Sequence, residues 1–191
     1  DWAKWLNGFV IDGDGNYLVW YYDYENTPRQ MHRIISTDKG KTWTDNGVCT
    51  MPTETGYFQQ VKRLSSGTLL GSYDDGTIKT SSDKTITKVA RSTDNGLTWT
   101  DIEINSEYFS VEQHFLEIDN VVMSIGRKNA YDTTQSPACI TYSKDDGLTW
   151  VTEKLSKTLL MHCGDAVSFI HDDIVEVFCN SRYYKIGRAH V

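Results

Sequence analysis

The chain has 191 residues, a formal net charge of −7 and 39% hydrophobic residues, which is a composition typical of a folded globular protein. The negative charge disfavours broad contact with nucleic acid or an anionic membrane, although a few arginines could hold an anionic ligand locally. No stretch approaches the roughly 18 apolar residues of a membrane span. We therefore expect neither nucleic acid nor a membrane to be a partner.

In chain order, alternating apolar runs joined by short polar turns predict antiparallel hairpins. The first joins residues 6–11 to 16–23 through a turn at residues 12–15. Asp12, Asp14 and Asn16 partly match the spacing of a calcium loop. The glycine and the distal glutamate of that loop are missing, however, so a hairpin turn is favoured. Further hairpins are predicted to join 57–64 to 68–73, 113–118 to 121–127 and 166–170 to 174–182.

An octapeptide follows the third predicted strand of each of the first three repeats. Its copies occupy residues 36–43, 92–99 and 143–150 and keep Ser, Asp, Gly, Thr and Trp at the same offsets. The Asp can accept hydrogen bonds from backbone N–H groups a residue or two ahead, and the Gly supplies a positive φ. Thr-Trp then begins a fourth strand, so each copy predicts the bend of a hairpin. The residues assigned to this structural turn are Asp38, Gly40, Trp43, Asp94, Gly96, Trp99, Asp145, Gly147 and Trp150.

The steps between these aspartates, 56 residues (38 to 94) and 51 residues (94 to 145), are typical of solenoids, propellers and arrays. The S-x-D-x-G-x-T-W pattern resembles the Asp-box, or BNR repeat, of the sialidase (neuraminidase) superfamily, whose members are β-propellers. The resemblance implies an all-β fold, a partial β-propeller of four-stranded antiparallel blades. In that family the motif lies on the outer rim, away from the substrate pocket, so it implies a structural role.

Repeat length predicts that the chain is a fragment. It holds about three and a half blades of an expected total of about six, whereas closed propellers have about 4–8. We expect residues 1–185 to form one incomplete propeller domain. Residues 186–191, Ile-Gly-Arg-Ala-His-Val, match the translation of a common sequencing adapter. They are expected to be a non-native tail from a truncated metagenomic read.

The third repeat contains the leading candidates for a site. Glu112 lies at the entry of its first strand and Arg127 at the exit of its second, and an antiparallel hairpin brings these two ends together. One blade of the sialidases has a similar arrangement, in which the Glu polarises a tyrosine nucleophile and the Arg helps to clamp the substrate carboxylate. A guanidinium suits that task because it offers paired donors to a planar anion. A solvated Glu and Arg at a blade edge would give the same pattern.

Weaker candidates lie in the other repeats. Arg182 ends the second strand of the fourth repeat, so by position alone it is a second substrate-clamping arginine. His162 precedes that repeat and is more often structural in such a place. Asp23 and Glu25 are the nearest carboxylates to an acid/base group, but acids in loops are usually solvated.

Several parts of the sialidase pattern are absent from the sequence. There is no opening Arg-Ile-Pro, no loop arginine beside the family's acid/base Asp, and no tyrosine that matches the nucleophile. The three repeats would then be the second to fourth blades, with the missing parts upstream and downstream. The alternative is that this propeller never had the full set.

The resemblance implies a retaining exo-sialidase-like glycoside hydrolase acting on terminal sialic acid or a related acidic sugar, with sialylated or other glycans as partners. No metal or organic cofactor is implied. The fragment itself is expected to be inactive, because it lacks the acid and the nucleophile. The alternatives are a non-catalytic propeller that binds glycans or proteins, such as a phage tail module, and a glycosidase that uses two carboxylates on a neutral sugar.

The four cysteines, Cys49, Cys139, Cys163 and Cys179, follow no zinc-binding spacing. Cys163 and Cys179 flank one predicted hairpin and could pair, but single buried thiols are favoured. The cysteines therefore leave the compartment open. For the full-length protein we expect secretion or a place on the cell surface rather than the cytoplasm.

Overall fold

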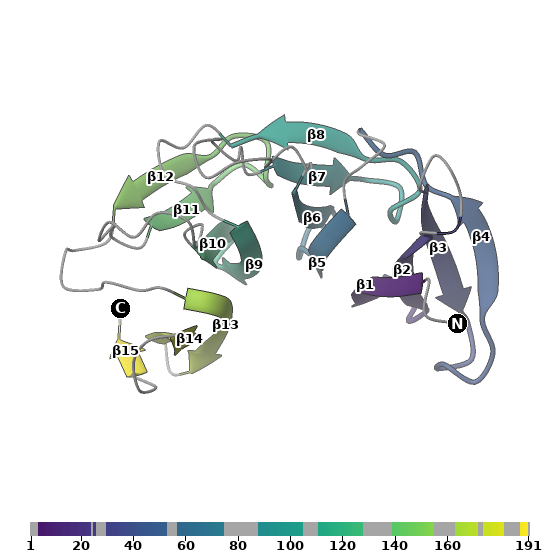
Figure 1. Cartoon of the computed structure of the whole chain (residues 1–191), viewed down its shortest axis with the longest axis horizontal. Coiled ribbons are helices and arrows are strands. Elements are labelled where there is room, and N and C mark those ends of the chain that lie inside the picture. Colours follow the sequence, from purple (N-terminus) through teal and green to yellow (C-terminus); the bar gives the residue numbers. More distant parts are fainter. Residues whose placement is uncertain are drawn as a thin grey trace. The chain divides into compact units, whose positions relative to one another are not determined.

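The computed structural model describes residues 4–23, 25, 30–52, 57–74, 88–104, 111–127, 139–154, 163–171, 174–181 and 188–190 (Figure 1). In these ranges the chain forms fifteen β-strands and no helix, which confirms the all-β prediction. Accordingly, the described part contains no helix that is long and apolar enough to cross a membrane. The strands are β1 (Lys4–Ile11), β2 (Tyr17–Asp23), β3 (Gln30–Ser36), β4 (Thr44–Val48), β5 (Tyr57–Arg63), β6 (Leu69–Asp74), β7 (Lys88–Ser92), β8 (Thr100–Glu103), β9 (Val111–Ile118), β10 (Val121–Arg127), β11 (Cys139–Ser143), β12 (Val151–Lys154), β13 (Cys163–His171), β14 (Ile174–Ser181) and β15 (Arg188–His190).

Strands that follow one another in the sequence are neighbours in each sheet. Among the described residues, three sheets have four strands, β1–β4, β5–β8 and β9–β12, and a fourth contains β13, β14 and β15. All strand pairs within these sheets are antiparallel. The predicted plan of four-stranded repeats is therefore confirmed for the first three repeats.

Three predicted hairpins begin earlier than the sequence pattern indicated. β1 begins at Lys4 rather than residue 6, β9 at Val111 rather than residue 113, and β13 at Cys163 rather than residue 166. Polar or glycine residues at these points interrupt the apolar alternation. The backbone can nevertheless continue to pair, because the ladder needs only N–H and C=O groups.

The chain divides into two compact units. The first comprises Asp1–Gly76 and Lys88–Glu103 and holds the sheets β1–β4 and β5–β8. The second comprises Thr77–Thr87 and Ile104–Val191 and holds the other two sheets, in which β13 contacts both β9 and β10. β15 pairs with β14, with Arg188 opposite Phe178. That residues 186–191 are non-native stays a prediction.

The three octapeptide turns (residues 36–43, 92–99 and 143–150) share one hydrogen-bond pattern. In the first, Asp38 accepts hydrogen bonds from the Thr42 backbone N–H (2.8 Å) and hydroxyl (2.6 Å) and from the Ser36 hydroxyl (2.8 Å). The Gly40 N–H donates to the Ser36 hydroxyl oxygen, and the Trp43 indole donates to the Gly40 carbonyl. The same bonds recur in the other two turns.

This pattern corrects one sequence prediction. The aspartate reaches Thr42, four residues ahead, rather than a residue or two ahead. The reason is that two consecutive residues adopt positive φ, Lys39 at 60° and Gly40 at 86°, and curl the backbone around the carboxylate. Asn95 with Gly96, and Asp146 with Gly147, do the same. The octapeptide therefore needs left-handed backbone at two positions, of which only the glycine was predicted.

Trp20 joins the two sheets of the first unit. Its side chain, on β2, is fully buried, donates its indole N–H to the Gly96 carbonyl (3.1 Å) and lies edge-on to Trp99, with ring centroids 5.8 Å apart. Removing about 150–250 Å² of tryptophan surface from water is worth about 4–6 kcal/mol at about 25 cal/mol per Å². A hydrogen bond contributes about 1 kcal/mol net. Burial of the ring is therefore the main stabilising term, and the hydrogen bond fixes its position.

Polar contacts also fix the positions of these two sheets relative to each other. The buried Arg33 donates to the Asn95 carbonyl (2.7 Å), and the Asn7 side chain donates to the Phe58 carbonyl (2.8 Å). Thr50 forms an isolated parallel bridge with Thr98. Several of these bonds end on residues 92–99, so this octapeptide turn is the platform on which the sheet β1–β4 rests.

We expect alanine at Gly96 to be more destabilising than alanine at Gly40. Both glycines have positive φ, which costs an alanine about 1–2 kcal/mol. A Cβ at Gly96 would also lie 2.3 Å from Trp20, whereas a Cβ at Gly40 would meet nothing closer than 3.7 Å. Overpacking adds about 1–3 kcal/mol, so we expect losses of about 2–5 kcal/mol for Gly96→Ala and about 1–2 kcal/mol for Gly40→Ala. Urea denaturation measures both, and equal losses would contradict the close approach of Trp20.

Acid should weaken the octapeptide turns. Hydrogen bonds from the Thr42 side chain and backbone, and from Ser36, lower the pKa of Asp38 to about 2, and the Thr149 hydroxyl likewise lowers the pKa of Asp145. At Asp94 burial raises the pKa, but hydrogen bonds led by Thr98 outweigh it and lower the pKa overall. A depressed carboxyl pKa contributes stability that is present above the unfolded pKa of about 4 and is lost as the pH falls through the folded pKa.

We therefore expect the melting temperature to fall between about pH 4 and pH 2. Replacing the three hydroxyl donors together, in the variant Thr42→Val, Thr98→Val and Thr149→Val, should raise the three carboxyl pKa values and reduce this fall. Thermal unfolding followed by circular dichroism at each pH measures the effect. An acid profile identical to that of the unmodified chain would show that the hydroxyls do not set these pKa values.

Candidate functional site

The β9–β10 hairpin carries the predicted residues Glu112 and Arg127. Its two-residue turn, Asp119 and Asn120, has positive φ at both positions (48° and 63°), as a type I′ turn requires. The register then runs from Ile118 opposite Val121 to Val111 opposite Arg127. Because Glu112 follows Val111, the backbones of Glu112 and Arg127 lie at the same end of the hairpin. Their side chains lie outside the described residues, so their roles stay predictions.

A β-bulge lies at this end of the hairpin. Between the pairs His114–Ile125 and Val111–Arg127, β9 has one more residue than β10. The same extra residue occurs on the first strand of the other repeats, between Leu6 and Gly8, Phe58 and Gln60, and Gly164 and Val167. Bulges re-aim side chains and are over-represented next to active sites. This feature was not predicted from the sequence, because the only effect of an added residue on the pattern is to shift the alternation of apolar and polar residues by one position.

Two weaker candidates and the cysteine pair fall outside the described side chains. Arg182 and His162 lie outside the described residues, although the strands beside them pair Cys163 with Ser181. The structure describes the backbones of Cys163 and Cys179 but not their side chains, so their pairing stays a prediction.

The predicted loop acids differ from each other. Asp23, the last residue of β2, is buried and accepts the backbone N–H of Glu25 (2.9 Å), whereas Glu25 is exposed. The expectation that both are solvated is therefore wrong for Asp23. Its carboxylate thus binds the backbone two residues ahead, which is a local structural role.

The Asp12 turn is held by its own carboxylate. Asp12 accepts the N–H groups of Asp14 (2.9 Å) and Asn16 (2.8 Å) and the Asn16 side-chain amide (3.0 Å). Burial raises the pKa of Asp12, but these hydrogen bonds outweigh it and lower the pKa overall. This bonding is that of a hairpin turn. Among the described residues, no group of three or more His, Cys, Asp or Glu side chains is placed to hold a metal ion.

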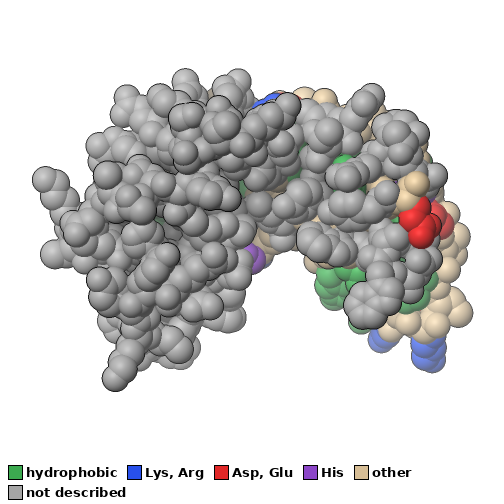
Figure 2. Space-filling model, in the orientation of Figure 1, with side chains coloured by type: hydrophobic (Ala, Val, Ile, Leu, Met, Phe, Trp, Pro, Cys, Tyr) green, Lys and Arg blue, Asp and Glu red, His purple; other side chains and the backbone are tan. Residues whose placement is uncertain are grey.

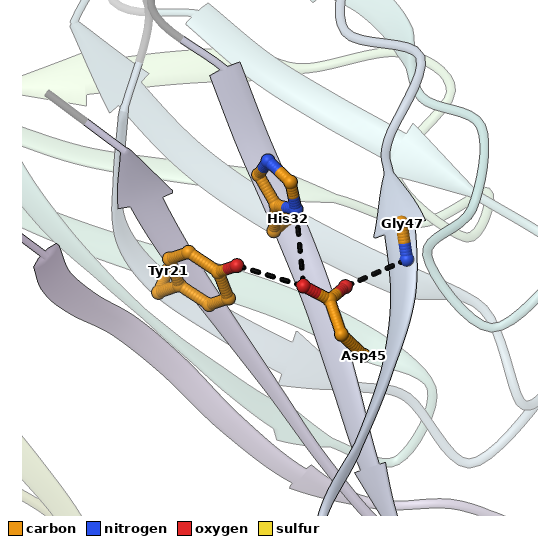
Figure 3. Close-up of polar contacts among 4 residues, drawn as sticks. All are labelled: Tyr21, His32, Asp45 and Gly47. Atoms are coloured by element: carbon orange, nitrogen blue, oxygen red, sulfur yellow. Dashed lines mark hydrogen bonds and ion pairs between the residues drawn. The ribbon is translucent and has the colours of Figure 1, made fainter. Parts of the chain in front are cut away.

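A cluster of Tyr21, His32 and Asp45 crosses the sheet β1–β4 and was not predicted (Figure 3). Tyr21 donates to Asp45 Oδ2 (2.9 Å), His32 Nδ1 lies 3.4 Å from the same oxygen, and the Gly47 N–H donates to Oδ1 (2.7 Å). The Tyr21 and His32 rings are stacked, with centroids 4.9 Å apart. Burial, followed by the hydrogen bond to Asp45, raises the pKa of Tyr21 to about 12. This phenol is therefore held neutral as a donor.

The second sheet has the same cluster. Tyr73 on β6 donates to Asp101 Oδ1 (2.7 Å), and Lys88 on β7 donates to Asp101 Oδ2 (3.1 Å). The order is again tyrosine on the second strand, a nitrogen base on the third and a carboxylate on the fourth. Because the cluster recurs with the repeat, we interpret it as a cross-sheet link that ties the outer strand to the second strand. The signal for it in the sequence is the shared offset of Asp45 and Asp101 behind the octapeptide aspartates.

Comparison with known proteins identifies the fold. Residues 7–182 match the sequence profile of the BNR repeat-like domain. No individually curated protein matches the chain at a significant level.

Three solved structures illustrate the structural likeness. The α-L-arabinanase of Penicillium chrysogenum complexed with arabinobiose is 18% identical, with a TM-score of 0.66 over 97% of this chain and 61% of that chain. The α-L-arabinofuranosidase of Fusarium graminearum with arabinobiose is 14% identical, with a TM-score of 0.64 over 97% of this chain and 60% of that chain. The sialidase of Trypanosoma rangeli in complex with 2,3-difluorosialic acid is 16% identical, with a TM-score of 0.59 over 90% of this chain and 33% of that chain.

The chain thus spans less than two thirds of the length of each of these proteins. At these identities the likeness shows the fold, and the expectation of a partial, sialidase-like β-propeller is confirmed. Because the profile match covers most of the chain, the protein belongs to the BNR repeat-like domain family.

Proposed function

We propose that the full-length protein is a propeller glycoside hydrolase and that the β9–β10 hairpin supplies part of its active site. The observation that carries the proposal is the hairpin register, in which Val111 lies opposite Arg127 and the backbone of Glu112 is next to this pair. A carboxylate and a guanidinium at one bulged strand end are suited to binding and activating a sugar. The names of the similar solved structures, an arabinanase, an arabinofuranosidase and a sialidase, support the same class.

For the substrate we propose terminal sialic acid or a related acidic sugar. Arg127 and Arg182 would bind its carboxylate, because a guanidinium offers two parallel N–H donors to a planar anion. Both arginines follow the same pattern, at or just after the end of the second strand of a repeat. In the retaining mechanism Glu112 would polarise a tyrosine nucleophile, as the resemblance to sialidases implies.

The nucleophile is proposed to come from a part of the full-length protein beyond these 191 residues. Tyr21 and Tyr73 do not suit the role, because each donates its hydroxyl to a carboxylate that ties the sheet together. For Tyr21 the raised pKa also opposes formation of the phenolate. We propose that residues 1–185 are one incomplete domain and that the 191-residue chain alone has no hydrolase activity.

Substitution of Glu112 tests the catalytic proposal. In the full-length protein, Glu112→Gln should lower kcat on a fluorogenic sialoside by about 10²–10⁴-fold, because the amide cannot take a proton from the nucleophile. The matched control is Glu117→Gln, a carboxylate farther along the same strand β9, which should leave kcat within about twofold. Unaffected turnover in Glu112→Gln would remove Glu112 from the site.

Substitution of Arg127 tests the acidic substrate separately. Arg127→Lys should raise KM for the sialoside by about 10-fold or more, because a lysine cannot make the bidentate contact. Hydrolysis of an arabinofuranoside, which has no carboxylate, should not respond to Arg127→Lys. If the wild-type protein cleaves only the neutral sugar, the acidic-sugar proposal is wrong while the glycosidase proposal stands.

A second candidate is a non-catalytic propeller that binds glycans. The observation that favours it is that Tyr21 and Tyr73 are both committed to structural hydrogen bonds. Saturable binding of a glycan by the full-length protein, without hydrolysis of either fluorogenic substrate, would support this candidate against the enzyme.

A further inference from the structure

The polar links of the first two sheets occupy matching positions but contain different bases. Tyr21 lies opposite His32 in the sheet β1–β4, and Tyr73 lies opposite Lys88 in the sheet β5–β8. Each base precedes the first serine of an octapeptide turn by four residues (32 to 36 and 88 to 92). The first sheet therefore has a histidine at the position where the second has a lysine.

In the first sheet the contact between base and acid is incomplete. His32 Nδ1 lies 3.4 Å from Asp45 Oδ2, which is longer than the about 2.7–3.2 Å of an ordinary N–H···O bond. Both ring nitrogens of His32 are buried, and neither has a hydrogen-bond partner of good geometry among the described residues. In the second sheet the Lys88 ammonium donates to Asp101 at 3.1 Å. A lysine is charged at neutral pH, so the second sheet has an ion pair where the first needs a proton to form one.

The groups that face His32 leave Asp45 as the partner of an added proton. On the same face of the described sheet, the titratable side chains of the neighbouring strands are Tyr17, Tyr21 and Asp23 of β2 and Asp45 of β4. Tyr21 is stacked on the imidazole and is held neutral, and the Asp23 carboxylate is occupied by a backbone N–H of the loop. Val48 lies opposite His32 on β4, and Figure 2 shows hydrophobic side chains gathered over β1.

Asp45 stays ionised over the range in which histidines titrate. Burial raises the pKa of Asp45, but the Gly47 N–H, the Tyr21 hydroxyl and His32 outweigh burial and lower the pKa overall. Histidine is the side chain whose charge changes between about pH 5 and pH 8. A histidine that gains a carboxylate partner on folding contributes stability at acidic pH, and the contribution is lost as the pH rises through that range. Protonation of His32 therefore creates an ion pair between β3 and β4.

The backbone holds β4 to β3 less regularly than it holds β8 to β7. Between the pairs Ile34–Asp45 and His32–Val48, β4 has one more residue than β3. The register of β8 with β7 has no such interruption. A bulge leaves its extra residue unpaired and disrupts the ladder locally. Because the bulge lies directly beside Asp45, the side-chain link carries more of the attachment of β4 than the matching link does for β8.

The residues that follow β4 join the first sheet to the second. The Cys49 N–H donates to the Met31 carbonyl (2.7 Å), and the next residue, Thr50, bonds to the second octapeptide turn. The Thr50 N–H donates to the Leu97 carbonyl (2.9 Å), and the Thr50 carbonyl accepts the Trp99 N–H (2.9 Å). The attachment of β4 to β3 therefore acts on a backbone contact between the two sheets.

We propose that His32 is a pH-sensitive switch in the first sheet. Its protonation as the pH falls from about 8 to about 5.5 converts the contact with Asp45 into an ion pair, which holds β4 and the sheet contact at Thr50 more firmly. The second sheet holds β8 in this way throughout the range, because Lys88 stays charged. The switch is a property of the fold and does not rest on the proposed hydrolase activity.

Amide hydrogen exchange with mass spectrometry on the full-length protein, at pH 8 and at pH 5.5, tests the switch. Each variant is compared with the unmodified protein at the same pH, so that intrinsic exchange rates cancel. His32→Gln, which is neutral at both pH values, should exchange residues 44–50 about threefold or more faster at pH 5.5 and at the same rate at pH 8. His32→Lys, which copies the second sheet, should exchange them about threefold or more slowly at pH 8 and equally at pH 5.5.

Two controls locate the effect. Residues 100–103 of β8 belong to the link that contains Lys88, so they should exchange equally in every variant. In a protein that carries Asp45→Asn, the added change His32→Gln should have the same effect at both pH values. A His32→Gln effect that does not differ between pH 8 and pH 5.5 would overturn the proposal. A pH response that persists with Asp45→Asn would overturn it too, because another group would then be its source.

Discussion

The contact between a tryptophan and the octapeptide turn of the next sheet is the constraint on which the first unit depends. The turn can receive Trp20 because Asn95 and Gly96 adopt left-handed backbone and leave the Gly96 carbonyl free to accept the indole N–H. The left-handed pair is in turn held by Asp94, whose carboxylate binds Thr98. The carboxylate thus acts on the packing of two sheets, although its hydrogen bonds with described residues all lie within its own turn. This gives a reason for a polar, largely exposed motif to recur in the first three repeats of an all-β chain.

The local features of the fold could be predicted and the contacts between distant strands could not. Hairpins and octapeptide turns follow from apolar alternation and from Asp and Gly at fixed offsets, which are properties of short stretches. The positive φ of Lys39, Asn95 and Asp146 was missed, because non-glycine residues adopt this conformation only when surrounding bonds compensate. Arg33 looks like a solvent-facing strand residue, yet it is buried because the Asn95 carbonyl accepts its guanidinium N–H.

The candidate site was predictable in position only. The hairpin pattern placed Glu112 and Arg127 at one end because antiparallel pairing is determined by the turn, and the two-residue turn at Asp119 and Asn120 gives that register. The extra residue at the start of each first strand was not predictable. It nevertheless decides which residue of β9 lies opposite each residue of β10 at the strand end. A shift of one residue moves a side chain to the other face of the sheet. At the bulged end of a strand, the position of a residue in the sequence is therefore a weaker guide to the role of its side chain than it is in the middle of the strand.

A tyrosine beside a carboxylate is not in itself a sign of catalysis in this fold. Tyr21 and Asp45 are in direct contact, but burial and the hydrogen bond keep the phenol protonated. Asp45 is also a weak base. Burial raises its pKa, but the Gly47 N–H, Tyr21 and His32 outweigh burial and lower it overall. A nucleophilic pair needs the reverse arrangement, a carboxylate with few competing donors and a tyrosine open to the substrate. The repeated Tyr–Asp link meets neither condition, so a catalytic role for Glu112 requires a tyrosine outside these links.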